Sequence, residues 1–496
     1  MKKRPNILLF FTDQQRFDTI HALGNPVIRT PHLDRLCREG AAFTSTYSPS
    51  PVCVPARCSM HYGQYPMNTG CYNNGMPMPD TRSFMDVLTR AGYRTHGVGK
   101  CHFTPDGKAL RGFETRDIQE ELSGPGDDYR DWLIAEGLGY VEEPHGMRGE
   151  MYYIPQPSML PPEKHPVHWI GDRSIQFLEE QSGGDRPWML FSSFIHPHPP
   201  FAPPVPWHKL YRAPLMPLPK VPQDPEHLHT FINRKQNRYK YRDQGIDQNL
   251  TRNIKAFYYA CISFIDYQVG RVLATLEKTG QLDDTLILFT ADHGEHLGDY
   301  NCFGKRSMHD TCARVPLLAR LPGRFEGGRR CDTPVSLVDV APTLFGATGV
   351  DGREMALDGV DLANVLNGAA ERDTVHSQIG REGERQGGAI YTTVTPRWKY
   401  AYSAPDDKEF LFDRVMDPQE TRNRAGLRMT QAALKALREK TMDWLRSGGE
   451  TDGLDGEHWR RIPAPEISDD PDTGLLIQDS GWRDLDLPGY THTDQA

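Results

Sequence analysis

The sequence contains no apolar run that approaches the roughly 20 residues of a membrane-spanning helix. Its first apolar stretch, residues 7–11, is too short for the hydrophobic region of a signal peptide, and no small-residue cleavage site follows it. We therefore expect a cytoplasmic protein with no membrane partner.

The cysteines lack every pattern that would indicate disulfides or a zinc site. There are nine, an odd number, and they are scattered without any Cys-x-x-Cys pair. This usage is typical of reduced thiols in a cytoplasmic protein.

The chain also lacks the excess of basic residues that a nucleic-acid-binding surface needs. Its formal net charge is −9, so we expect no nucleic-acid partner, and an anionic substrate would need cations gathered locally. The abundant proline and glycine, 40 and 45 residues, favour a loop-rich α/β enzyme over a helical bundle.

Strand and helix patterns alternate up to about residue 345. Residues 5–12 and 285–290 are uninterrupted apolar runs, typical of strands buried on both faces of a parallel sheet. We therefore predict an α/β fold with a large, mostly parallel sheet covered by helices on both faces. Residues 197–250 are predicted to be long loops.

The pattern changes after about residue 370. Short strands are predicted at 389–395, 398–402 and 409–413, followed by a helix at 430–446. This predicts a catalytic domain, residues 1–370, and a C-terminal subdomain, residues 371–496, with a small antiparallel sheet and one helix. The acidic tail from about residue 448 could wrap the body or contact a neighbouring subunit in a homo-oligomer.

Two acids follow the buried strands. Asp13 ends the first, and Asp292 ends the second in the segment Asp292-His293-Gly294. Open α/β sheets place their sites at such strand ends, and a divalent cation such as Ca²⁺, Mg²⁺ or Mn²⁺ would draw the two carboxylates together. The alternative is that each acid only caps a helix or a turn.

The segment Cys53-Val54-Pro55-Ala56-Arg57 resembles the signature of the type I sulfatases in the alkaline phosphatase superfamily. The resemblance implies an alkaline-phosphatase-like fold. It also implies that Cys53 is oxidised to formylglycine, whose hydrate is the nucleophile, with Arg57 beside it. A formylglycine-generating or anaerobic sulfatase-maturing enzyme would then be a partner.

The same resemblance implies one divalent cation, with Ca²⁺ preferred. Its ligands would be Asp13, Gln14, the modified residue 53, Asp292 and His293. Gln14 departs from the family, which usually has a second Asp there. The pair Asp13-Gln14 with Asp292-His293 also occurs in the branch of phosphonate monoester and phosphodiester hydrolases.

Further motifs match the family's cationic residues. Gly99-Lys100-Cys101-His102 resembles its Gly-Lys-x-His element, and His196-x-His198-x-Pro200 resembles its His-x-His-x-Pro element. The resemblance implies Lys100, His102 and Lys305 around the sulfate and His198 as general acid for the leaving oxygen. Asn74 is a candidate substrate contact, although a turn residue is the plainer interpretation.

The sequence thus predicts a sulfatase that hydrolyses an aryl or carbohydrate sulfate ester. The alternative enzyme is a phosphonate monoester or phosphodiester hydrolase on the same fold. A binding protein that has lost catalysis is a remote alternative, because the nucleophile and the metal acids are all present.

Overall fold

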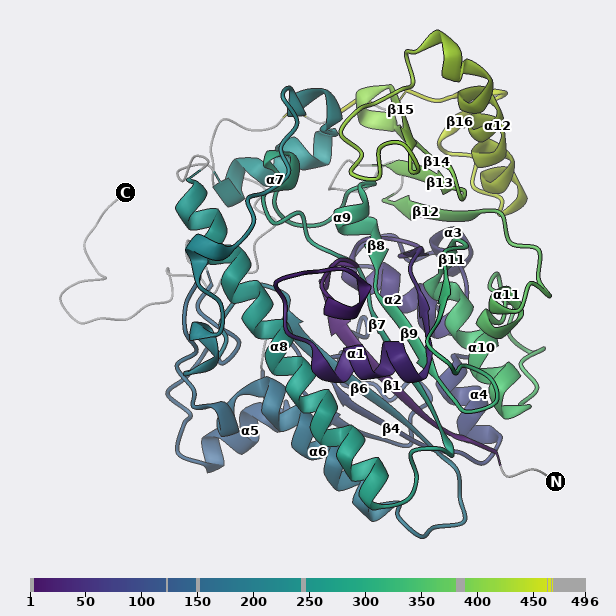
Figure 1. Ribbon diagram of the computed structural model, residues 1–496. Helices are drawn as coiled ribbons and strands as arrows, with labels where there is room; N and C mark the ends of the chain where they lie inside the picture. Colours follow the sequence, from purple (N-terminus) through teal and green to yellow (C-terminus); the bar gives the residue numbers. More distant parts are fainter. Residues whose placement is uncertain are drawn as a thin grey trace.

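The computed structural model describes residues 4–121, 124–148, 152–241, 247–380, 389–461, 463–464 and 466. An eight-stranded sheet runs through the centre (Figure 1). Its order is β10 (Arg329–Cys331), β2 (Ala41–Phe43), β9 (Leu317–Arg320), β7 (Thr285–Ala291), β1 (Asn6–Asp13), β6 (Trp188–Pro197), β4 (Arg94–Gly99) and β5 (Thr115–Ile118).

The five strands from β7 to β5 are mutually parallel, as the apolar runs predict. The exception is β9, which runs antiparallel to both β7 and β2. The sheet is therefore mixed but mostly parallel, with the carboxyl ends of β1 and β7 side by side at one edge.

Helices cover both faces of the sheet, and β1 shows why. Ile7, Leu9 and Phe11 belong to one apolar cluster, whereas Leu8 and Phe10 belong to the other. Alternate residues of a strand point to opposite faces, so a strand buried on both sides must be apolar throughout.

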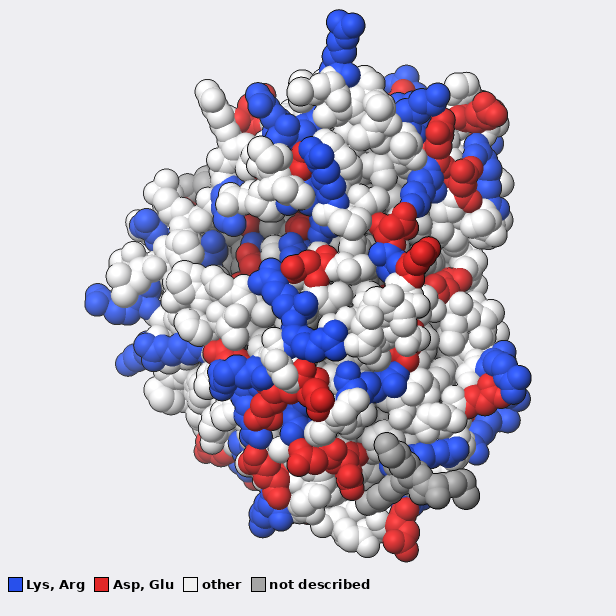
Figure 2. All heavy atoms as spheres, turned by 45° about the vertical axis from the view of Figure 1, so that its right-hand side comes forward, with Lys and Arg blue, Asp and Glu red and all other residues white. Residues whose placement is uncertain are grey.

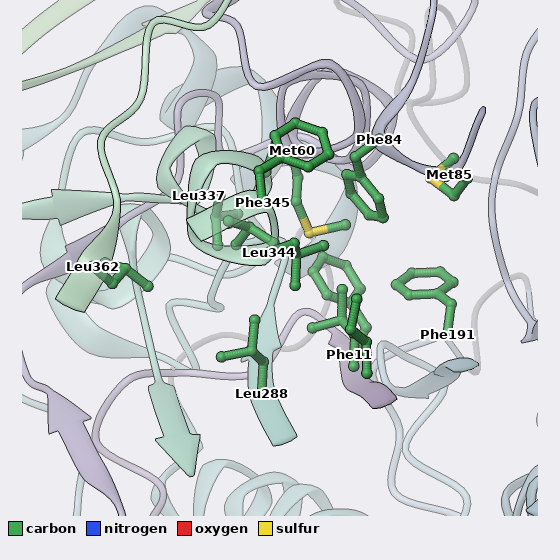
Figure 3. Close-up of a cluster of buried hydrophobic side chains, with 14 of the residues drawn as sticks. Phe11, Met60, Phe84, Met85, Phe191, Leu288, Leu337, Leu344, Phe345 and Leu362 are labelled. Carbon is green, nitrogen blue, oxygen red and sulfur yellow. The ribbon is translucent and has the colours of Figure 1, made fainter. Parts of the chain in front are cut away.

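The first cluster joins the sheet to α2 (Cys53–Tyr62), α4 (Phe84–Arg90) and α10 (Val340–Thr348). Figure 3 shows Phe11 and Leu288 from the sheet beneath Met60, Phe84 and Leu344 of these helices. The second cluster joins the opposite face to α1 (Pro31–Glu39), α6 (Pro166–Glu180) and α8 (Gln248–Lys278). The first cluster thus anchors α2, which carries the signature cysteine at its first residue.

The prediction that residues 197–250 are only loops is wrong. Helix α7 (Phe231–Tyr241) lies within them, and α8 begins at Gln248, where the side chain of Asp247 caps its first turn. The start of α8 falls inside the predicted loop because its first turn is polar, and the side chain of Asp247 accepts hydrogen bonds from the backbone N–H groups of Asn249 and Leu250.

The C-terminal region forms an antiparallel sheet of four strands, one more than predicted. The order is β12 (Val375–Ile379), β13 (Ile390–Val394), β14 (Trp398–Ser403) and β15 (Lys408–Asp413). Helix α12 (Gln431–Ser447) packs on one face through Leu434, Leu437 and Leu445. The other face packs on the large domain, where Ala401 and Phe410 meet Val52.

The proposed division at residue 370 stays a prediction, although β12 begins soon after it. The first part of the acidic tail, residues 448–461, is described and contacts the body, because Trp459 stacks on Tyr402 and Tyr72 donates to Glu450 at 3.0 Å. Most of the tail after residue 461 lies outside the described residues, and its predicted contact with a second subunit stays a prediction.

Among the described residues, no helix is both long enough and apolar enough to cross a membrane. Lys and Arg are interspersed with Asp and Glu over the face of the molecule drawn in Figure 2. The cations that an anionic substrate needs must therefore be sought inside a site and not on this face.

Candidate active site

Two acids meet at the carboxyl edge of the central sheet. Asp13 is the last residue of β1, and Asp292 directly follows β7, the strand paired with β1. Ligand atoms of Asp13, Cys53, Asp292 and His293 all lie within 4.8 Å of one another, and all four residues are buried. The structure therefore brings together four of the five predicted metal ligands.

The carboxylates of Asp13 and Asp292 repel each other electrostatically. Burial and the nearby Asp13 raise the pKa of Asp292 to about 6. Burial acts in the same direction on Asp13, but Lys100, His198 and Arg57 together hold its pKa well below the usual value. A divalent cation between the two acids would relieve this repulsion, so the electrostatics fit a metal site.

Gln14, the fifth predicted metal ligand, lies next to Asp292 and has a side-chain oxygen without a hydrogen-bond partner. Its φ of 65° turns the chain sharply after β1, and its backbone N–H donates to Asp292 Oδ1 at 2.9 Å. The side-chain Nε2 donates to the Glu295 carboxylate, while the buried Oε1 has no hydrogen-bond partner. An orphaned buried oxygen is costly, and coordination of a hard cation would satisfy it.

Cys53 is the first residue of α2 and is almost completely buried. Its Sγ lies 2.8 Å from Lys305 Nζ and 3.3 Å from His293 Nε2. Burial and Asp13 oppose ionisation, but Lys305, Lys100 and His293 hold the pKa of this thiol well below its usual value. The surroundings of residue 53 therefore stabilise its thiol as an anion.

Arg57 lies one turn further along α2 and has no solvent exposure. Its guanidinium donates to Asp13 Oδ2 at 3.2 Å and to Asp292 Oδ2 at 3.1 Å. The remaining nitrogen donates to the Lys100 carbonyl and to Ser193 Oγ. With its nitrogens engaged in this way, Arg57 fixes the two acids and the turn after β4.

Two lysines and a histidine complete the cluster. Lys100 Nζ lies 2.7 Å from Asp13 Oδ2, and Lys305 Nζ lies 3.0 Å from His198 Nε2. Lys100 follows β4 and His198 follows β6, so neighbouring strand ends deliver both groups. The sequence motifs therefore converge on Cys53 from three separate segments.

No hydrogen bond joins the side chain of His102 or Asn74 to the cluster of charged groups among the described residues. The backbone N–H of His102 donates to Glu120 at 3.1 Å, and no hydrogen bond joins its ring to the cluster among the described residues. The Oδ1 of Asn74 accepts from the Val54 N–H at 3.1 Å, which holds the first turn of α2. Asn74 thus contacts the nucleophile's helix and not the cluster itself.

Sequence reasoning missed two buried acids beside the site. Glu295 accepts hydrogen bonds from Gln14, from Tyr153 at 2.8 Å and from the Gly304 backbone. Glu121 contacts both Lys100 and His198. Glu121 follows the end of β5 by three residues, so the strand-end rule that found Asp13 could have found it.

Two solved structures of similar fold are phosphonate monoester hydrolases. The chain resembles the phosphonate monoester hydrolase of Agrobacterium radiobacter at 25% identity, with a TM-score of 0.77 over 90% of this chain and 96% of that one. It also resembles phosphonate monoester hydrolase SpPMH from Silicibacter pomeroyi, at 25% identity and a TM-score of 0.78 over 92% and 99%.

Curated relatives cover most of the chain. A choline-sulfatase of Rhizobium meliloti is 32% identical over 469 residues, which are 88% of this chain and 86% of the relative. An arylsulfatase of Clostridium perfringens is 28% identical over 493 residues, 91% of this chain and 96% of the relative.

Two family models match. The one described as N-sulphoglucosamine sulphohydrolase, C-terminal, matches residues 298–447, and the one described as Sulfatase matches residues 5–350. The second range contains Cys53, both metal-type acids and all the cations of the cluster. This chain belongs to the sulfatase family of sulfuric ester hydrolases.

Proposed function

We propose that the protein hydrolyses an aryl or carbohydrate sulfate ester, with a formylglycine made from Cys53 as the nucleophilic residue. The observation that carries the proposal is the position of Cys53 Sγ, 2.8 Å from Lys305 Nζ and inside the cluster of Asp13, Asp292 and His293. An anionic nucleophile and an anionic sulfate both need cations in a dry site. Lys305 and Lys100 supply positive charge directly, and the two acids would hold a metal ion that adds more.

The metal would be held by Asp13, Gln14, residue 53, Asp292 and His293. The orphaned Gln14 Oε1 and the crowded carboxylates support this set. Its mostly oxygen character suits Ca²⁺, Mg²⁺ or Mn²⁺, and of these we propose Ca²⁺. A bound cation would supply positive charge at the nucleophilic oxygen and at the sulfate.

The chain's own side chains have separable tasks. Lys305 and Lys100 offset the negative charge of the sulfuryl group during its transfer to residue 53. His198, whose Nε2 lies beside Lys305, would protonate the departing oxygen. Arg57 holds Asp13 and Asp292 in register for these steps.

Three measurements test the proposal. After co-expression with a formylglycine-generating enzyme, mass spectrometry of the peptide that contains residue 53 should show the aldehyde or its hydrate. An active enzyme with a wholly unmodified thiol would contradict this nucleophile. Chelation should abolish turnover, and metal analysis should find one divalent ion per chain.

A second candidate, phosphonate monoester or phosphodiester hydrolysis, rests on Gln14 and His293 and on the fold shared with two phosphonate monoester hydrolases. Kinetics on matched phenyl sulfate, phosphodiester and phosphonate substrates separate the two. We expect kcat/KM to favour the sulfate, and a clear preference for the phosphonate or diester would establish the second candidate.

All nine cysteines lie in the described residues and none is in a disulfide, which supports our proposal of a cytoplasmic location. Binding of a sulfate monoester and of a maturation enzyme, with no nucleic-acid or membrane partner, completes the proposal.

A further inference from the structure

The buried carboxylate of Glu121 lies beside the reacting groups but outside the cluster of Asp13, Cys53, Asp292 and His293. Glu121 is 6% exposed, and Lys100 Nζ donates to its Oε2 at 2.7 Å. Its Oε1 lies 3.3 Å from His198 Nδ1 and accepts from Arg148 Nη1 at 3.2 Å. One carboxylate thus joins residues that come from two separate motifs.

Glu121 is present as an anion. Burial alone would raise its pKa, but His198, Lys100 and Arg148 hold the pKa well below the usual value. A buried carboxylate with three cationic or titratable partners has no proton to give and is not free to act as a base. Its effect on a reaction must therefore pass through the groups that it holds.

The contacts of His198 fix which of its ring nitrogens faces the site. Nδ1 lies 2.7 Å from the Pro199 carbonyl oxygen and 3.3 Å from Glu121, and both atoms are acceptors, so Nδ1 carries a hydrogen. Nε2 lies 3.0 Å from the ammonium of Lys305, which leaves Nε2 as the acceptor in the neutral ring. Nε2 is therefore the nitrogen that can take up a proton from the Lys305 ammonium and deliver it to the leaving oxygen.

The second contact of Glu121 orients a cation. Lys100 Nζ lies 2.7 Å from Asp13 Oδ2 and 2.7 Å from Glu121 Oε2, so the ammonium is held between two carboxylates. Without Glu121, Lys100 would keep its 2.7 Å contact with Asp13, so the loss of Glu121 should act mainly through His198.

We propose that Glu121 is a positioning residue of the sulfuryl-transfer site, which orients His198 to protonate the leaving oxygen. This inference rests on the function proposed above. It assigns to Glu121 a role that depends on the leaving group, because a proton on the departing oxygen matters most when that oxygen is basic.

The test compares Glu121→Gln with the wild type on two substrates. Phenyl sulfate has a basic leaving oxygen and 4-nitrophenyl sulfate a weakly basic one. We expect kcat for phenyl sulfate to fall by about 10- to 100-fold, the size of a partly lost proton transfer, and kcat for 4-nitrophenyl sulfate to fall by less than about 5-fold. KM for both should change little, since the sulfate keeps Lys305.

Two further variants complete the design. Glu121→Asp keeps the charge at a shorter reach and should recover part of the phenyl sulfate rate. Glu114→Gln is the matched control, because Glu114 pairs with Arg94 and Arg186 away from the site, and it should leave both rates unchanged.

The outcomes separate the inference from the function on which it rests. Equal loss on both substrates, a change in KM alone, or no loss would overturn the role of Glu121. If Glu121→Gln does not fold, Glu121→Asp decides by the same comparison of the two substrates. A wild type that is fully converted to formylglycine but hydrolyses neither sulfate would instead refute the proposed function.

Discussion

The protein contains two buried clusters of acids and cations, and they differ in how completely their charges are matched. One is the active-site cluster around Asp13 and Asp292. The other lies where the C-terminal sheet meets the large domain and is centred on Lys399, a residue of β14 with no solvent exposure. We call it the interface cluster, defined by Asp310, Lys399 and Glu420.

In the interface cluster, Lys399 Nζ donates to Asp310 Oδ1 at 2.7 Å and to the Met308 carbonyl oxygen at 2.7 Å, and it pairs with Glu420. Asp310 also accepts from Tyr47 at 2.9 Å and from Arg314 at 3.2 Å. The described residues therefore supply both carboxylates with counterions and donors.

The active-site cluster is left incomplete by comparison. Gln14 Oε1 has no partner, and the pKa of Asp292 is raised to about 6, whereas that of Asp310 is pushed well below its usual value by Lys399 and Arg314 despite burial. Full burial alone therefore does not identify a site. The raised pKa of one acid beside another distinguishes the active-site cluster from the interface cluster.

The largest expected effect separates chemistry from folding. Cys53→Ala removes the precursor of the nucleophile, so kcat on 4-nitrophenyl sulfate should fall by at least ~1,000-fold, as expected for loss of a covalent nucleophile. The melting temperature should change little, because the contact of Cys53 Sγ with Lys305 belongs to the active site and does not hold the fold together. Cys58→Ala, in the same helix and equally buried, is the control and should remain active.

The interface cluster should respond in the opposite way. Lys399→Met leaves Asp310 and Glu420 buried without their shared cation, which should cost about 3–5 kcal/mol of unfolding free energy. The kcat of the folded fraction should stay close to that of the wild type. Thermal unfolding together with active-site titration measures both quantities.

Lys435→Met, on the exposed face of α12, is the matched control for that variant and should be neutral. A stability loss in Lys399→Met below about 1 kcal/mol would show that the interface cluster is not the structural counterpart described above.

Within the active-site cluster, Lys100→Ala should lower kcat/KM for a sulfate ester by at least ~100-fold, or about 2.7 kcal/mol. His102→Ala should cost less, because its ring has no hydrogen bond to the cluster among the described residues. A silent Lys100→Ala would favour the phosphonate or phosphodiester candidate over the sulfatase.

The sequence predicted the central strands and the strand-end acids well, because uninterrupted apolar runs and the acids that follow them are local patterns. It could not predict the antiparallel direction of β9, which depends on its pairing with β7, or the strand β12, whose sequence Val375-His376-Ser377-Gln378-Ile379 is mostly polar. Helix α7 was missed because its residues are mostly polar and show no apolar stripe.

The sequence motifs predicted five residues of the site: Cys53, Arg57, Lys100, His198 and Lys305. The motifs did not reveal that the donors of Arg57 are engaged by Asp13 and Asp292. The sequence motifs also did not reveal the buried acids Glu121 and Glu295. Neither belongs to a motif, and each gains its contacts only when separate segments fold together.

The smallest expected effect extends the comparison to Asp266, a buried acid of α8 with no cation at all among its described contacts. Its carboxylate accepts only the backbone N–H groups of Leu33 at 2.8 Å and His32 at 3.3 Å, at the start of α1. Burial raises its pKa from 3.8 to about 7, although these N–H groups oppose the shift.

Between pH 4 and pH 7 the folded protein therefore holds a proton on Asp266 that the unfolded chain has released, so this residue's contribution to stability falls as pH rises. Asp266→Asn removes the titration but keeps an oxygen acceptor. We expect the variant to be no more stable than the wild type at pH 5 and to gain roughly 1–2 kcal/mol relative to it at pH 8. Melting temperatures at both pH values measure the gain, and Asp351→Asn, a fully exposed control, should show none. A constant difference between Asp266→Asn and the wild type would mean that the two backbone N–H groups alone match this carboxylate, and that a buried acid in this protein needs no cation.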